Sequence, residues 1–139
     1  MFACNWDGWS CIETATNLGL HYPASVKVVK VSCLTRVHVG LILKAFEFGA
    51  DGVMLLGCEE GRCRFGADSG HIVEEYQRAR SILEMLGISK DRLVLVQVPA
   101  FDGHQFVNQA MKLIRDIQQI RAMKRPRIVG PRLIQNIKV

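Results

Sequence analysis

Four short apolar runs recur along the chain, separated by longer segments in which apolar residues repeat with a helical period. The apolar runs cover residues 1–5, 26–32, 52–57 and 93–98. Most are rich in valine and leucine, and such nearly continuous apolar runs are typical of strands buried on both faces of a parallel sheet. We therefore predict four strands, the last of which ends at Pro99.

Helices are predicted after each strand, over residues 9–18, 35–48, 70–86 and about 102–124. In the second of these segments the apolar residues recur at i, i+4, i+5, i+8 and i+9, which places them in one stripe. That stripe consists of Val37, Leu41, Ile42, Ala45 and Phe46. Gly49 is suited to end this helix, and Asp102 is suited to cap the start of the last one.

Regular alternation of strands and helices indicates an α/β domain. We expect a single domain over residues 1–124, with a four-stranded, mostly parallel sheet and helices on both faces, followed by an extended tail over 125–139. A chain of 139 residues is long enough for one core but not for two. In such sheets ligands bind beyond the carboxyl ends of the strands.

Composition narrows the class of protein. A hydrophobic fraction of 49% argues against intrinsic disorder. No apolar run approaches the ~20 residues of a membrane span, and Met1 leads into the first strand without the basic segment of a signal peptide. We therefore expect a cytoplasmic protein without a membrane span.

Positive charge is concentrated at the C-terminal end. Residues 112–139 hold eight Lys and Arg against one acid, a net of +7, whereas the other residues sum to −2. The tail at 125–139 alternates basic with aliphatic residues, contains two prolines and lacks aromatic residues for base stacking. We interpret it as a docking tail for a protein partner rather than for nucleic acid.

The five cysteines carry the candidate chemistry. Cys4, Cys33 and Cys58 close three of the predicted strands, and Cys11 and Cys63 follow in the adjoining segments. Neighbouring strands lie about 4.8 Å apart, so thiols at adjacent strand ends can reach one small cofactor. In a reducing compartment, grouped cysteines are more often metal ligands or redox catalysts than structural disulfides.

The spacing of the cysteines bears on which cofactor they hold. Cys58 and Cys63 form a C-x4-C step comparable to one used by plant-type [2Fe–2S] proteins. Zinc sites usually contain C-x2-C knuckles, and thioredoxin-like exchangers contain C-x-x-C; this chain has neither. The four histidines also lack metal-ligand spacing. A zinc-bound or metal-free α/β scaffold module and a thiol-based redox regulator remain alternatives.

Four segments carry a resemblance to a known family. They are Phe2-Ala3-Cys4-Asn5-Trp6, the stretch from His21-Tyr22-Pro23 to Val31-Ser32-Cys33-Leu34-Thr35-Arg36, Ala45-Phe46-Glu47-Phe48-Gly49-Ala50-Asp51-Gly52-Val53, and Gly57-Cys58-Glu59-Glu60-Gly61-Arg62-Cys63. Together they resemble the delta subunit of methyl-viologen-reducing nickel–iron hydrogenase over about residues 2–115.

The resemblance implies a non-catalytic electron-transfer subunit that carries one [2Fe–2S] cluster. Its implied partners are a hydrogenase, formate dehydrogenase or other redox module on one side, and the flavin subunit of a heterodisulfide reductase-like complex in anaerobes on the other. Cys4, Cys33, Cys58 and Cys63 fall on cysteine positions of the family.

One position departs from the family pattern. The N-terminal motif of the family resembles Cys-Asn-Trp-Cys, and Asp7 stands here at the fourth place, with Cys11 four residues later. Either Cys4 or Cys11 therefore completes a set with the other three cysteines, and Asp7 as an oxygen ligand is a third possibility. Trp6 and Trp9, which bracket Asp7, either shield a cofactor or pack against the first helix.

Overall fold

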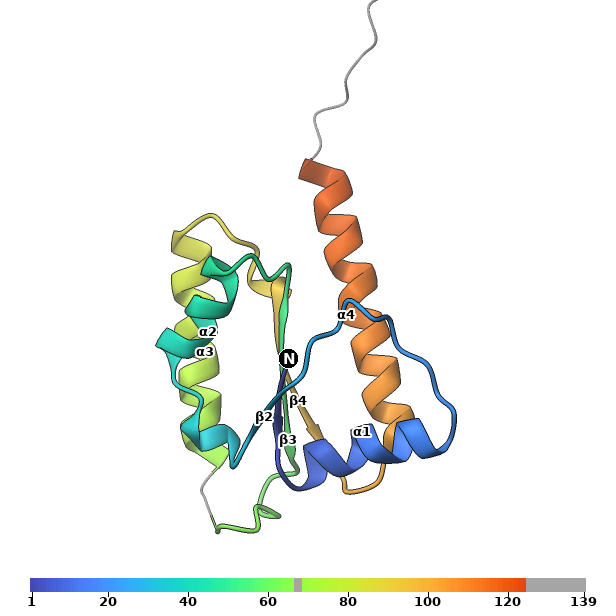
Figure 1. The fold of residues 1–139 in the computed structure, drawn as a ribbon. Coiled ribbons are helices and arrows are strands. Elements are labelled where there is room, and N and C mark those ends of the chain that lie inside the picture. Colours follow the sequence, from blue (N-terminus) through green and yellow to red (C-terminus); the bar gives the residue numbers. More distant parts are fainter. Residues whose placement is uncertain (67–68, 125–139) are drawn as a thin grey trace, which may run out of the picture.

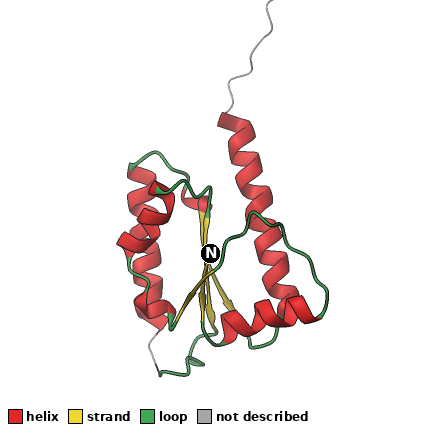
Figure 2. Ribbon diagram, in the orientation of Figure 1, coloured by secondary structure: helices red, strands yellow, loops and turns green. Residues whose placement is uncertain are grey.

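The computed structural model describes residues 1–66 and 69–124 as a three-layer α/β domain (Figures 1 and 2). Its central sheet contains β1 (Phe2–Cys4), β2 (Val29–Val31), β3 (Val53–Cys58) and β4 (Leu93–Val98). The strands lie in the order β2-β1-β3-β4, and every pairing is parallel. The predicted fold class is confirmed, and the sheet is parallel throughout.

Two helices cover each face of the sheet. Helices α2 (Val39–Glu47) and α3 (Ser69–Met85) pack on one face, and α1 (Asp7–Asn17) and α4 (Gly103–Lys124) pack on the other (Figure 1). Asp102 caps α4 as predicted, because its Oδ1 accepts a hydrogen bond from Gln105 N at 2.9 Å. Gly49 has a φ of 90°, the left-handed conformation expected of a helix terminator.

Alternate residues of the strands enter two separate hydrophobic cores. Val53 and Leu55 of β3 join the core beneath α2 and α3, whereas Met54 and Leu56 join the core beneath α1 and α4. This follows from the two-residue period of a strand. Cys4 belongs to the core beneath α2 and α3, and Cys58, the last residue of β3, packs against the same core.

The second strand and the second helix are much shorter than their patterns indicated. The strand expected over 26–32 is limited to Val29–Val31, because its partner β1 offers only three residues for pairing. The helix expected over 35–48 begins at Val39, after a 3-10 turn at Leu34–Arg36 and an extended Val37. The helical stripe included Val37 because this residue is apolar and, in the structure, fully buried, but its backbone is not helical.

A buried carboxylate sets the start of α2. Glu75 of α3 is 5% exposed; its Oε2 accepts a hydrogen bond from Val39 N at 2.6 Å, and its Oε1 pairs with Arg78 at 2.7 Å. Carboxylates near a helix N-terminus stabilise it by satisfying backbone N–H groups and opposing the helix dipole. Because this contact joins residues 36 positions apart, a local sequence pattern does not reveal where the helix begins.

Replacing Glu75 by alanine is expected to lower the free energy of unfolding by about 1–3 kcal/mol, because the N–H of Val39 loses its buried acceptor. Urea unfolding followed by circular dichroism measures the change. Glu47→Ala is the matched control, since the exposed Glu47 only pairs with exposed Lys44, and such pairs contribute about 0–1 kcal/mol. Equal effects of the two substitutions would contradict the capping role.

No helix within residues 1–66 and 69–124 is long and apolar enough to cross a membrane. The predicted docking tail at 125–139 lies outside the described residues, so its role stays a prediction.

Candidate functional site

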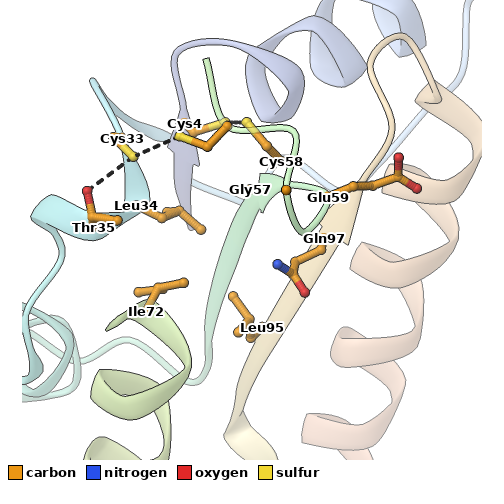
Figure 3. Close-up of a pocket in the computed structure, with 12 residues that line it drawn as sticks. Cys4, Cys33, Leu34, Thr35, Gly57, Cys58, Glu59, Ile72, Leu95 and Gln97 are labelled. Atoms are coloured by element: carbon orange, nitrogen blue, oxygen red, sulfur yellow. Dashed lines mark hydrogen bonds between the residues drawn. The ribbon is translucent and has the colours of Figure 1, made fainter. Parts of the chain in front are cut away.

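A cavity of about 40 Å³ opens at the carboxyl edge of the sheet, where the strands end (Figure 3). Four of the five cysteines line it: Cys4, Cys33, Cys58 and Cys63. Apolar side chains close its floor, among them Leu34, Ile72 and Leu95, while Glu59 and Gln97 also border it. The structure therefore gathers the thiols where ligands of parallel sheets are expected.

Cys4 and Cys58 form the first thiol pair. They are the last residues of the neighbouring strands β1 and β3, and Ala3 is paired in register with Leu56. Continued by one residue, this register sets Cys4 beside Gly57, so Cys58 lies one residue further along its strand. Their Sγ atoms lie 3.6 Å apart.

Cys33 and Cys63 form the second pair. Cys33 follows β2 and precedes the 3-10 turn, and Cys63 lies in the loop after β3. Their Sγ atoms lie 3.8 Å apart, and Thr35 Oγ1 donates a hydrogen bond to Cys33 Sγ at 3.2 Å. All five cysteines of the chain are free thiols.

The N-terminus of α1 supports Cys4. Gly8 N donates a hydrogen bond to Cys4 Sγ at 3.2 Å, so the sulfur satisfies one of the backbone N–H groups that a helix start leaves without a partner. A side chain at position 8 would not fit, because a Cβ would lie 2.5 Å from the carbonyl oxygen of Leu56. Glycine thus allows α1 to approach the sulfur closely.

Burial raises the pKa of the Cys58 thiol to about 12, and the neighbouring Cys4 contributes in the same direction. A backbone hydrogen bond from Asp7 opposes the shift. Cys58 is therefore a neutral thiol near pH 7 in the chain without a metal. Because metals bind the thiolate, metal uptake at this position must release a proton.

Cys11 lies apart from the four. It is fully buried on α1 in the core beneath α1 and α4, and its Sγ donates a hydrogen bond to the carbonyl oxygen of Pro99 at 3.1 Å. Burial raises the pKa of this thiol as well. The structure thus brings together four of the five predicted ligands and places Cys11 among packing residues on the other face of the sheet.

Asp7 contributes to the site through its backbone, by the hydrogen bond to Cys58. Its carboxylate does not line the cavity. Sequence reasoning missed three groups that donate to sulfur, namely Gly8, Thr35 and the backbone of Asp7. The hydroxyl two residues after Cys33 was a local signal for the second, but nothing in the sequence marked the amide of Gly8 as a donor.

Comparison with known proteins identifies the family of this chain. The family model described as "Methyl-viologen-reducing hydrogenase, delta subunit" matches residues 1–121. The chain belongs to this family. The predicted resemblance is thereby confirmed over most of the described residues.

Delta-subunit relatives match over most of their length. The vhc iron-sulfur subunit of the F420-non-reducing hydrogenase of Methanococcus voltae is 35% identical over 122 residues, which cover 88% of this chain and 83% of that protein. The iron-sulfur subunit of the F420-non-reducing hydrogenase of Archaeoglobus profundus is 30% identical over 122 residues, covering 88% of this chain and 89% of that protein.

A longer relative contains a similar segment. It is a subunit of the ferredoxin:CoB-CoM heterodisulfide reductase of Methanosarcina mazei, and it is 25% identical over 119 residues, which make up 86% of this chain. The chain spans only 15% of that protein's length. A delta-subunit-like segment thus also occurs as one part of a larger redox protein.

Proposed function

We propose that this chain is an electron-transfer subunit that holds one [2Fe–2S] cluster on Cys4, Cys33, Cys58 and Cys63. The observation that carries the proposal is the pairing of the thiols, with Sγ–Sγ separations of 3.6 Å and 3.8 Å. Two thiolates on one tetrahedral metal with bonds of about 2.3 Å are about 3.8 Å apart. Each pair therefore suits one metal, and a [2Fe–2S] cluster takes two cysteines at each of its two irons.

The pairing also favours a binuclear cofactor over a single zinc ion. Within residues 1–66 and 69–124, no group of three or more His, Cys, Asp or Glu side chains is arranged to hold one metal ion. A structural zinc site would need four such ligands around one point. Two separate pairs instead match the two metal positions of the proposed cluster.

The surroundings of the sulfurs suit a redox group. When bound, such a cluster accepts and releases one electron at a time. Gly8 N and Thr35 Oγ1 donate hydrogen bonds to Cys4 and Cys33, and Leu34, Ile72 and Leu95 keep water from one side. Hydrogen bonds to sulfur and burial are the levers by which a protein sets the reduction potential. The chain holds and tunes the cluster and binds no substrate in this proposal.

The relatives support part of the set of partners that we propose, and the family resemblance supplies the rest. Several are named as subunits of F420-non-reducing hydrogenases, and one is a heterodisulfide reductase subunit that includes a segment similar to this chain. A segment that occurs within one protein in some organisms commonly works beside it when separate. We therefore propose that the protein relays electrons between a hydrogenase, formate dehydrogenase or other redox module and a heterodisulfide reductase-like flavin subunit.

Metal and sulfide analysis tests the cofactor. Protein purified without oxygen from native cells is expected to contain two irons and two acid-labile sulfides per chain, because four thiolates can ligate one [2Fe–2S] cluster. Visible absorption that bleaches on reduction by dithionite should accompany them. Zinc without sulfide, or a colourless protein without iron, would overturn the proposal in favour of a scaffold module.

A further inference from the structure

Trp6 has a buried hydrogen-bond donor without an acceptor. Its indole Nε1 is shielded from solvent and has no hydrogen-bond partner among the described residues. An unsatisfied buried donor costs about 1–3 kcal/mol, and native proteins rarely leave one. Trp6 therefore calls for an acceptor in the complete protein.

The surroundings of Trp6 connect it to the thiols on two sides. Trp6 follows Cys4 by two residues, and its ring packs against the apolar core that contains Cys4 and contacts Cys58. The loop after Cys63 supplies the other neighbours: the Arg64 guanidinium lies 4.2 Å from the ring centroid, and the Phe65 ring meets it edge-on at 6.2 Å. The indole is thus wedged between the segments that carry Cys4 and Cys63.

Trp9, three residues further along the chain, has an indole N–H with a hydrogen-bond acceptor. Its Nε1 donates a hydrogen bond to Glu13 Oε1 at 2.7 Å, and Lys30 Nζ lies 4.2 Å from its ring centroid. Both indoles contact a cation, but Trp6 packs against the core beneath α2 and α3 and Trp9 against the core beneath α1 and α4. Of the two, Trp9 has an acceptor. The missing acceptor therefore distinguishes Trp6, the indole next to the thiols, from Trp9.

We propose that Trp6 Nε1–H donates a hydrogen bond to a sulfur of the cluster held by the four cysteines and thereby raises its reduction potential. The inference rests on the proposed function. Reduction adds negative charge to the cluster, and a hydrogen bond to a charged acceptor is stronger than one to a less charged acceptor. The bond therefore stabilises the reduced state more, and a buried, low-dielectric site strengthens this effect. Trp6 acts as a positioning and tuning residue and is not itself a ligand.

A redox titration of the isolated, cluster-loaded protein tests the inference. Trp6→Phe keeps an aromatic ring for Arg64 and Phe65 and removes the N–H. We expect its midpoint potential to fall by the equivalent of a tenfold change in the reduced-to-oxidised ratio, about 59 mV for one electron. The matched control is Trp9→Phe, which removes an indole N–H bonded to Glu13 and should leave the potential unchanged.

The outcomes separate this inference from the proposed function. A wild-type protein that binds no cluster would overturn both. A cluster of unchanged potential in Trp6→Phe would overturn the role of Trp6 and leave the cluster assignment in place, and so would equal shifts in the two variants.

A second measurement does not depend on the folding of a variant. Wild-type protein with 15N-labelled indoles is compared by NMR with and without the cluster. With the cluster reduced, the close approach that the hydrogen bond requires predicts strong shift and broadening of the Trp6 indole resonance, with a much smaller change for Trp9. Equal behaviour of the two resonances would contradict the proposed bond.

Discussion

Cys58→Ser is expected to abolish bound iron and sulfide in the purified protein, whereas Cys11→Ser is expected to leave both at the wild-type level. Cys58 lies 3.6 Å from Cys4 at the cavity, so its loss leaves one of the two proposed metal positions with a single thiol. Cys11 instead bonds to the carbonyl oxygen of Pro99 on the other face of the sheet. A serine hydroxyl at position 11 can make the same hydrogen bond.

Iron and sulfide determination and the visible spectrum after anaerobic purification measure both effects. Cys4→Ser completes the series, because the sequence left Cys4 and Cys11 as competing ligands. We expect it to behave like Cys58→Ser. Cluster loss in Cys11→Ser combined with retention in Cys4→Ser would show that the fourth ligand is wrongly assigned, and retention of a normal spectrum in Cys58→Ser would refute the site.

The second large effect is expected from Gly8→Ala, which should lower the free energy of unfolding by about 1–3 kcal/mol, as overpacking of a close contact does. A Cβ at this position would lie 2.5 Å from Leu56 O and 3.3 Å from Cys4 Sγ. Because Leu56 O belongs to the backbone of a central strand, α1 must move instead. That movement also draws Gly8 N away from Cys4, so the variant should bind less iron.

Urea unfolding and iron content are measured on the same preparations of Gly8→Ala and of a control, Gly40→Ala. Gly40 is exposed in α2, and its added Cβ would meet only the side chain of His38. Alanine there should stabilise the helix by up to about 1 kcal/mol. If Gly8→Ala has the same free energy of unfolding and iron content as the control, the close approach of α1 to β3 is not required for stability or for iron binding.

Local patterns were sufficient for the architecture. The apolar runs and the helical stripes each depend on neighbours a few residues apart, so the element order, the parallel sheet and the cap at Asp102 followed from the sequence. The boundaries that went wrong depend on distant residues. The start of α2 is set by Glu75, and the length of β2 is set by the short strand β1.

The candidate site, too, could be predicted only as far as local sequence patterns determine it. Strand ends placed Cys4, Cys33 and Cys58 at one edge, because parallel strands end together. The sequence put Cys11 near the start of a helix but could not say which face of that helix meets the sheet. Only the packing of α1 against α4 shows that Cys11 is turned away from the cavity. The unsatisfied N–H of Trp6 likewise exists only in three dimensions.

The short edge strand β2 has a consequence for how the protein matures. It is joined to the sheet by three paired residues, and Val29 within it is 50% exposed. Cys33 lies two residues after this edge strand, while the other three thiols belong to β1 and the segment from the end of β3 onward. A cofactor bound by all four thiols would connect the edge strand β2 to the centre of the sheet. Cofactor binding and completion of the fold would then be linked, because binding to the folded chain stabilises it.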